Sequence, residues 1–123
     1  MKAKHVLSFL FALLLGLTAL EVCAQADKAA SPVEVRLSEY SIDMPHTLPA
    51  GPTSFLVRNE GKKNHSFKIE GPGITGMLEK PIGPGATSTL TLTLQPGDYK
   101  VYCPIGSHET KGMTMTLKVV NPG

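Results

Sequence analysis

The chain has 123 residues and a formal net charge of +2, from twelve Lys and Arg against ten Asp and Glu. This length favours a single domain, and the near balance of charge excludes the strongly basic surface that nucleic-acid binders need. We find no internal repeat and no low-complexity tract along the sequence.

The first residues have the layout of an export signal. Two lysines make a positive start, residues 6–20 form an almost unbroken apolar run, and Val22-Cys23-Ala24 follows it. A positive segment, an apolar segment and small residues before a cleavage point define a secretory signal peptide. We therefore predict a signal peptide over 1–24, a single mature domain over 25–123, and a periplasmic or secreted location.

Two alternatives for this leader remain open. An uncleaved membrane anchor is one, although the apolar run of 15 residues falls short of the ~18 that a membrane span needs. Lipid attachment to Cys23 is the other, because Leu20 lies three residues before it, although Glu21 and Val22 fit that motif poorly. We expect no stable membrane insertion of the mature domain.

Removal of the leader leaves the mature domain with one cysteine, Cys103. Its net charge becomes about +1, because two lysines and one glutamate leave with the signal peptide. Exported proteins normally pair their cysteines in disulfides, so a single thiol calls for another explanation. Coordination of a metal ion is one, because a bound thiolate is occupied as a ligand.

After a small polar lead at 26–31, apolar and polar residues alternate with a period of two, which is the pattern of half-buried β-strands. Pro- and Gly-rich turns separate the alternating stretches, and this combination predicts an all-β, antiparallel sandwich or barrel. A sandwich of this size can bury one adequate core without disulfides. The connection 71–86 contains no clear strand, and we expect a short helix over 76–80. The alternating stretches are 33–38, 53–59, 65–69, 90–94, 99–103 and 113–119.

The most informative stretch is the loop from Cys103 to Met113. One predicted strand ends at Cys103 and another begins at Met113, and His108 lies midway with four residues on either side of it. Gly112 allows the chain to turn into the final strand. The loop therefore brings a thiolate, an imidazole and a thioether to one end of the sandwich. Two His and one Cys with a long, weak Met bond suit copper in electron transfer, so the loop lacks only a second imidazole.

The second imidazole comes from His65 or His46. His65 follows the turn 59–64 and shares the parity of Phe67 and Ile69, which we predict to face inward. His46 lies in a polar turn, and we expect it to be exposed to solvent. His65 is therefore the natural candidate.

Several of these residues have an ordinary structural alternative. Taken alone, Cys103 could be an inert buried thiol, His108 a surface residue and Met113 part of the core. Their joint spacing favours a metal site instead. The lysines at 62–63 could form a docking patch, although a solvated turn is the simpler interpretation.

The segments 59–67 and 103–113 resemble the copper-binding segments of the cupredoxins, or type 1 blue copper proteins. The spacing of four residues on each side of His108 is similar to that of rusticyanin and auracyanin. The resemblance implies an eight-stranded Greek-key β-sandwich, mainly antiparallel, with one type 1 copper ion. By the same resemblance, His65, Cys103 and His108 are the strong ligands and Met113 is the axial ligand.

The resemblance also implies a function. It implies a carrier, not an enzyme, that exchanges single electrons with redox proteins such as a c-type cytochrome, an oxidase or a reductase, and we expect a monomer. Ser66 stands where the family places a residue that hydrogen-bonds near the thiolate, which implies a fairly high reduction potential.

Two other functions stay open. A copper-binding module for metal delivery or buffering would use the same ligands, although no open coordination shell or Met-rich tract is evident. An enzyme with Cys103 as nucleophile and His108 as base is the other, but no third orienting residue is evident.

Overall fold

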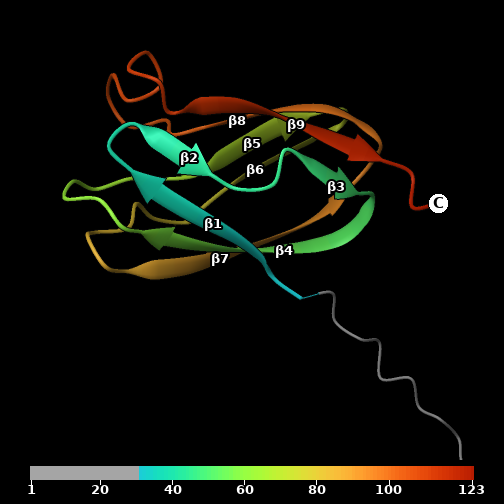
Figure 1. Ribbon diagram of the computed structural model, residues 1–123, viewed down its shortest axis with the longest axis horizontal. Coiled ribbons are helices and arrows are strands. Elements are labelled where there is room, and N and C mark those ends of the chain that lie inside the picture. Colours follow the sequence, from blue (N-terminus) through green and yellow to red (C-terminus); the bar gives the residue numbers. More distant parts are fainter. Residues whose placement is uncertain (1–30) are drawn as a thin grey trace, which may run out of the picture.

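The chain folds into a sandwich of two β-sheets, as the computed structural model of residues 31–123 shows (Figure 1). The predicted signal peptide, its cleavage point and Cys23 lie outside the described residues. Residues 31–123 contain nine strands and no helix, so the all-β prediction is confirmed. The strands are β1 (Val33–Ser38), β2 (Ser41–Asp43), β3 (Thr47–Pro49), β4 (Gly51–Asn59), β5 (Lys68–Gly71), β6 (Ile74–Met77), β7 (Thr87–Leu94), β8 (Gly97–Tyr102) and β9 (Thr114–Val120).

The chain crosses between the two sheets several times, so that strands consecutive in sequence often lie in different sheets. One has four strands in the order β2-β1-β4-β7, and the other has five in the order β3-β9-β8-β5-β6. Most neighbouring strands are antiparallel, whereas β1 pairs parallel with β4 and β3 pairs parallel with β9. The predicted mainly antiparallel Greek-key sandwich is confirmed. The described chain has more strands than the eight implied by the resemblance, because residues 41–49 form two three-residue strands in different sheets.

The connection between β5 and β7 differs from the prediction. Residues 74–77 form β6, which pairs antiparallel with β5, so the expected helix over 76–80 is wrong. Gly76 explains the error, because it is buried in this strand and a Cβ there would lie 2.6 Å from Cδ1 of Leu92 in the facing sheet. A glycine that allows such close packing leaves no apolar side chain to mark the alternation.

The inward-facing residues of both sheets form one core, which confirms the predicted parity of the strands. Phe55 of β4 and Phe67, just before β5, contact each other across the sandwich with ring centroids 5.4 Å apart. Burying each such ring stabilises the fold by about 1.5–3 kcal/mol. Tyr99 is buried too, and its hydroxyl bonds both the N–H and the carbonyl of Gln95 at 2.9 Å, so the polar end is satisfied. The other fully buried apolar side chains include Val35, Leu37, Val57, Val101 and Leu117.

Three loops meet at one end of the sandwich. Because β1 and β4 run parallel, the turns that follow them, at 39–40 and 60–64, lie at the same end of their sheet. The loop 103–113 between β8 and β9 lies at that end too, opposite the C-terminus (Figure 1). The predicted site residues therefore come from segments that the topology gathers together.

Candidate metal centre

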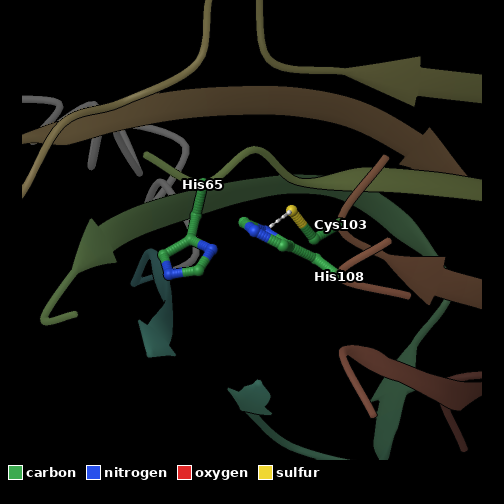
Figure 2. Close-up of side chains that lie close together, drawn as sticks. All are labelled: His65, Cys103 and His108. Atoms are coloured by element: carbon green, nitrogen blue, oxygen red, sulfur yellow. Dashed lines mark hydrogen bonds between the residues drawn. The ribbon is translucent and has the colours of Figure 1, made fainter. Parts of the chain in front are cut away.

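Three of the predicted site residues converge at this end of the sandwich. One ligand atom each from His65, Cys103 and His108 lies within 4.8 Å of the other two. Cys103 Sγ is 3.6 Å from His108 Nδ1, and the two imidazole rings have centroids 4.9 Å apart. Figure 2 shows the three side chains close together, with Cys103 and His108 on one loop and His65 on a separate segment. Cys103 and His65 are fully buried, whereas His108 is half-buried.

The loop that carries Cys103 and His108 is held by its own backbone. Cys103 N–H donates to the Met113 carbonyl, and Met113 N–H donates to the His108 carbonyl, both at 3.1 Å. At Gly112 the backbone has a φ of 118°, a conformation that glycine adopts without strain, and the chain turns there into β9 as predicted. These bonds fix the spacing between thiolate and imidazole before any metal is bound.

His65 is held differently from the prediction. It does not open a strand, since β5 begins only at Lys68. Instead it forms an isolated bridge with Ile82, in which His65 N–H donates to the Ile82 carbonyl at 3.1 Å and Ile82 N–H donates back at 2.8 Å. The prediction that His65 faces inward with Phe67 and Ile69 is confirmed, because all three are buried.

A buried asparagine supports the His65 segment. The side-chain amide of Asn59 donates to the Lys63 carbonyl at 2.7 Å and to the Ile82 carbonyl at 2.8 Å. Its oxygen accepts the Gly61 N–H at 2.8 Å. One fully buried side chain thus ties the turn 60–64 to the segment that bridges His65.

The thiolate position also has a hydrogen-bond donor. The backbone N–H of Ser66 donates to Cys103 Sγ at 3.4 Å. Such a bond tunes the electron density on the sulfur. The donor at position 66 is the backbone amide, so this bond does not depend on the serine side chain.

His65 is bonded to a carboxylate on the side away from the cluster. Its Nε2 lies 3.1 Å from Oε1 of Glu39, which follows β1. The same Oε1 accepts the backbone N–H of Lys63 at 2.8 Å and that of Lys62 at 2.7 Å. The Lys63 bond, with those of His65 and Lys62, lowers the pKa of the Glu39 carboxyl to about 2 against the opposing effect of burial. Glu39 is therefore ionised at neutral pH.

The other ring nitrogen of His65 has no partner. Nδ1 is buried and makes no hydrogen bond within the described chain. Since the Glu39 carboxylate accepts from Nε2, the neutral ring carries its proton on Nε2 and keeps a free lone pair on Nδ1. An unpaired buried acceptor is costly unless something binds it. A thiolate and two imidazoles with such a lone pair fit a soft or borderline metal ion.

His108 lies at the rim of the cluster. Burial lowers its pKa, and the charges of the nearby Lys63 and Lys111 lower it further. Tyr40 packs edge-on against the ring, with centroids 5.4 Å apart. The Lys63 and Lys111 ammonium groups each lie 3.4 Å from the Tyr40 hydroxyl, which lowers the pKa of that phenol. The neutral imidazole is thus favoured, and a cationic rim surrounds its outer side.

The remaining predicted residues have simpler outcomes. Met113 is fully buried and follows directly after the loop, and its role as axial ligand stays a prediction. His46 is exposed, as predicted, and is not part of the cluster.

Sequence reasoning missed Glu39 and Tyr40. They lie in the turn after β1, about 25 residues before His65, and carry no motif of their own. Only the parallel pairing of β1 with β4, which aligns Leu37 with Asn59, would have placed this turn beside the 60–64 turn. The local sequence contains no signal for that pairing.

The sandwich and its cluster of one thiol and two imidazoles define the class of the protein, a β-sandwich of the cupredoxin type. The model of the cupredoxin-like domain matches residues 7–116, and the chain belongs to that family. The resemblance seen in the sequence is therefore confirmed. Residues 31–123 contain no helix long and apolar enough to cross a membrane.

Known proteins resemble the chain in fold and sequence. Reduced auracyanin from Roseiflexus castenholzii superposes with a TM-score of 0.60 at 19% identity, covering 75% of this chain and 98% of that one. A copper-containing nitrite reductase from Thermus scotoductus gives 0.55 at 24% identity, covering 75% of this chain and 23% of the enzyme. These likenesses show the fold alone, which an enzyme can share.

A curated relative is more similar in sequence. The iron uptake system component EfeO of Yersinia pestis is 32% identical over 110 residues, which cover 88% of this chain. The match spans only 29% of the length of that relative. The similarity therefore concerns one part of a longer protein.

Proposed function

We propose that this chain is a type 1 copper protein that carries single electrons between redox partners. The observation that carries the proposal is the convergence of His65, Cys103 and His108 within 4.8 Å, with a buried His65 Nδ1 that has no partner within residues 31–123. In this proposal the strong ligand atoms are Cys103 Sγ and a nitrogen of each imidazole, and Met113 is the axial ligand. Bound copper supplies a one-electron couple between Cu(II) and Cu(I).

The residues of the site would keep the cost of electron transfer small. The thiolate and thioether are soft donors that suit Cu(I), whereas imidazole suits both states. The ligand loop is closed by backbone hydrogen bonds, and His65 is fixed by its bridge to Ile82. A rigid, largely buried donor set changes little between oxidation states and excludes water.

The rim around His108 suggests where partners dock. His108 is the half-buried member of the cluster, so its outer edge is the shortest path from the donors to the surface. Lys63 and Lys111 flank it through Tyr40, which favours a partner with an acidic face. A c-type cytochrome, an oxidase or a reductase would meet this requirement. The protein would act as a monomer in the periplasm or outside the cell.

The proposal gives the chain no enzymatic activity of its own. Four ligands from one chain would fill the coordination shell and leave no open position for a substrate. Catalytic metal sites, in contrast, keep such a position.

Copper addition tests the proposal directly. The purified protein with Cu(II) should develop an intense thiolate-to-copper charge-transfer band in the visible spectrum, which ascorbate bleaches. C103S and H65A should lose the band, whereas H46A, which replaces an exposed histidine, should keep it. A colourless wild-type protein that binds only zinc would overturn the proposal.

The likeness to an iron uptake component favours a second candidate, a module that handles metal during uptake. The same residues would then deliver or buffer a metal ion. Rapid transfer of copper to an acceptor protein, with slow electron exchange, would favour this role. Binding of iron in preference to copper would favour it too, although a thiolate–imidazole set is better suited to copper.

A further inference from the structure

The carboxylate of Glu39 contacts His65 from outside the ligand cluster. Its Oε1 lies 3.1 Å from His65 Nε2, and the Glu39 side chain is only 26% exposed. Glu39 is not among the ligands proposed above, and it lies on a different segment of the chain from all of them. A charged group in this position can influence the site without touching a metal ion.

The turn after β4 is shaped around this carboxylate. The N–H groups of Lys62 and Lys63 both point at Oε1, at 2.7 and 2.8 Å. At Gly61 a Cβ atom would lie 2.5 Å from the same oxygen, so a larger residue there would displace the carboxylate. Asn59 holds Gly61 in place through its side-chain oxygen. Two backbone N–H groups and His65 Nε2 thus surround one oxygen atom of Glu39, and the absence of a side chain at Gly61 leaves room for it.

A carboxylate in this position has two separable effects. By accepting from Nε2 it fixes the orientation of the ring and leaves the Nδ1 lone pair directed at the cluster. By its negative charge it favours the more highly charged state of a bound ion. A neutral carbonyl acceptor would supply the first effect without the second.

We propose that Glu39 is a positioning residue that orients His65 for metal binding and, through its negative charge, stabilises the oxidised over the reduced metal. This inference rests on the proposed copper site. It predicts a lower reduction potential than the same ligands would have beside a neutral partner.

The variant E39Q separates charge from orientation. All three donors meet at Oε1, so the glutamine carbonyl can take its place while the negative charge is lost. Mutation of an outer partner of a ligating histidine typically weakens metal binding by about 10–100-fold. We expect such a loss for Cu(II). The Coulomb energy is half as large for a monovalent ion, so Cu(I) affinity should fall by only about 3–10-fold.

The difference between the two losses sets the shift in potential. A net 3–10-fold bias toward Cu(I) corresponds to a rise of about 30–60 mV, at 59 mV per tenfold change for one electron. Voltammetry measures this shift, and competition with Cu(I)- and Cu(II)-specific chelators measures the two affinities. Urea unfolding of the metal-free variants checks that the fold is retained.

The variant G61A tests position without changing charge. Its added methyl group should push the carboxylate away from His65, because the contact would involve the far end of the Glu39 side chain. We expect Co(II) and Cu(II) affinities to fall about tenfold, as for loss of an outer partner. In the metal-free protein, the ¹⁵N spectrum of His65 should change from the Nε2–H tautomer to a mixture.

The variant E60Q is the matched control. Glu60 is in the same turn and loses the same charge, but its carboxylate pairs with Arg36 at 3.7 Å and is 46% exposed. It should leave the affinities and the potential close to those of the wild type.

The outcomes distinguish this inference from the proposed function. If wild-type protein forms the copper charge-transfer band but E39Q shifts the potential no more than E60Q does, the charge effect is refuted. If G61A keeps wild-type affinity and a pure Nε2–H tautomer, the positioning effect is refuted. If wild-type protein forms no such band, the proposed function fails, whereas the Co(II) affinities and tautomer still test the positioning effect.

Discussion

Asn59 should be the most sensitive polar residue of this end of the sandwich. Replacing it with alanine removes three hydrogen bonds, to the carbonyls of Lys63 and Ile82 and from the N–H of Gly61. The Ile82 bond is buried, but the Ile82 carbonyl also accepts the His65 N–H, so it would not lose its last partner. A net hydrogen bond contributes about 1 kcal/mol, so the three bonds together contribute about 3 kcal/mol. We therefore expect N59A to lower the free energy of unfolding by about 3 kcal/mol.

Urea unfolding of the metal-free protein measures this loss. With a slope of about 1–1.5 kcal/mol per molar urea for a small domain, the midpoint should fall by about 2–3 M. S54A is a matched control, because Ser54 makes one exposed bond to Thr91 at 3.3 Å and should change stability by less than about 0.5 kcal/mol.

A second variant at this position, N59D, tests the need for a donor. N59D preserves the size and the acceptor oxygen but places a carboxylate oxygen against two carbonyls that need a donor. At neutral pH it should be at least as unstable as N59A, since its second carboxylate oxygen would be buried against two carbonyls with no donor. A loss below about 1 kcal/mol in both variants would show that the turn is held by its backbone alone, and the assigned role of Asn59 would be wrong.

Three further changes test separate parts of the molecule. M113L should leave copper bound and raise the reduction potential. The rise is about 59 mV for each tenfold loss of Cu(II) affinity relative to Cu(I). An unchanged potential in voltammetry would show that Met113 is not part of the site. Lys68, 3.0 Å from the Glu70 carboxylate, holds the pKa of Glu70 below its ordinary 4.5. A carboxyl whose pKa is lower in the folded state than in the unfolded state stabilises the fold above its ordinary pKa, and this stabilisation is lost as the pH falls through the folded-state pKa. E70Q should therefore make the unfolding free energy of the metal-free protein fall less steeply on the acid side. K111E should slow electron exchange with an acidic c-type cytochrome severalfold at low salt and weaken the salt dependence of the rate. K118E, at the other end of β9, should have neither effect. Equal effects of the two variants in stopped-flow kinetics would exclude docking at the cationic rim.

The sequence predicts the residues of this cluster well because the signals that mark them are local. Strand parity places His65 on the inward face, and the glycine before Met113 marks where the chain turns into its last strand. Cys103 and His108 lie on one short loop, so their proximity needs no knowledge of the fold. The prediction fails in β6 for an equally local reason, since Gly76 removes the side chain that would have revealed the alternation.

What surrounds the cluster depends on which strands become neighbours, and alternation does not encode that choice. The parallel pairing of β1 with β4 aligns Leu37 with Asn59, so the residues two positions after these, Glu39 and Gly61, lie in adjacent turns. Glu60 N–H donates to the Leu37 carbonyl at 2.8 Å, which continues the register into the turns and sets Glu39 against Gly61. The candidate metal residues are thus marked by short-range pattern, whereas the charge behind His65 is specified by sheet order. A substitution that shifted the β1–β4 register would preserve the ligand loop and still remove the carboxylate, because a one-residue slip reverses the side of the sheet that each side chain faces.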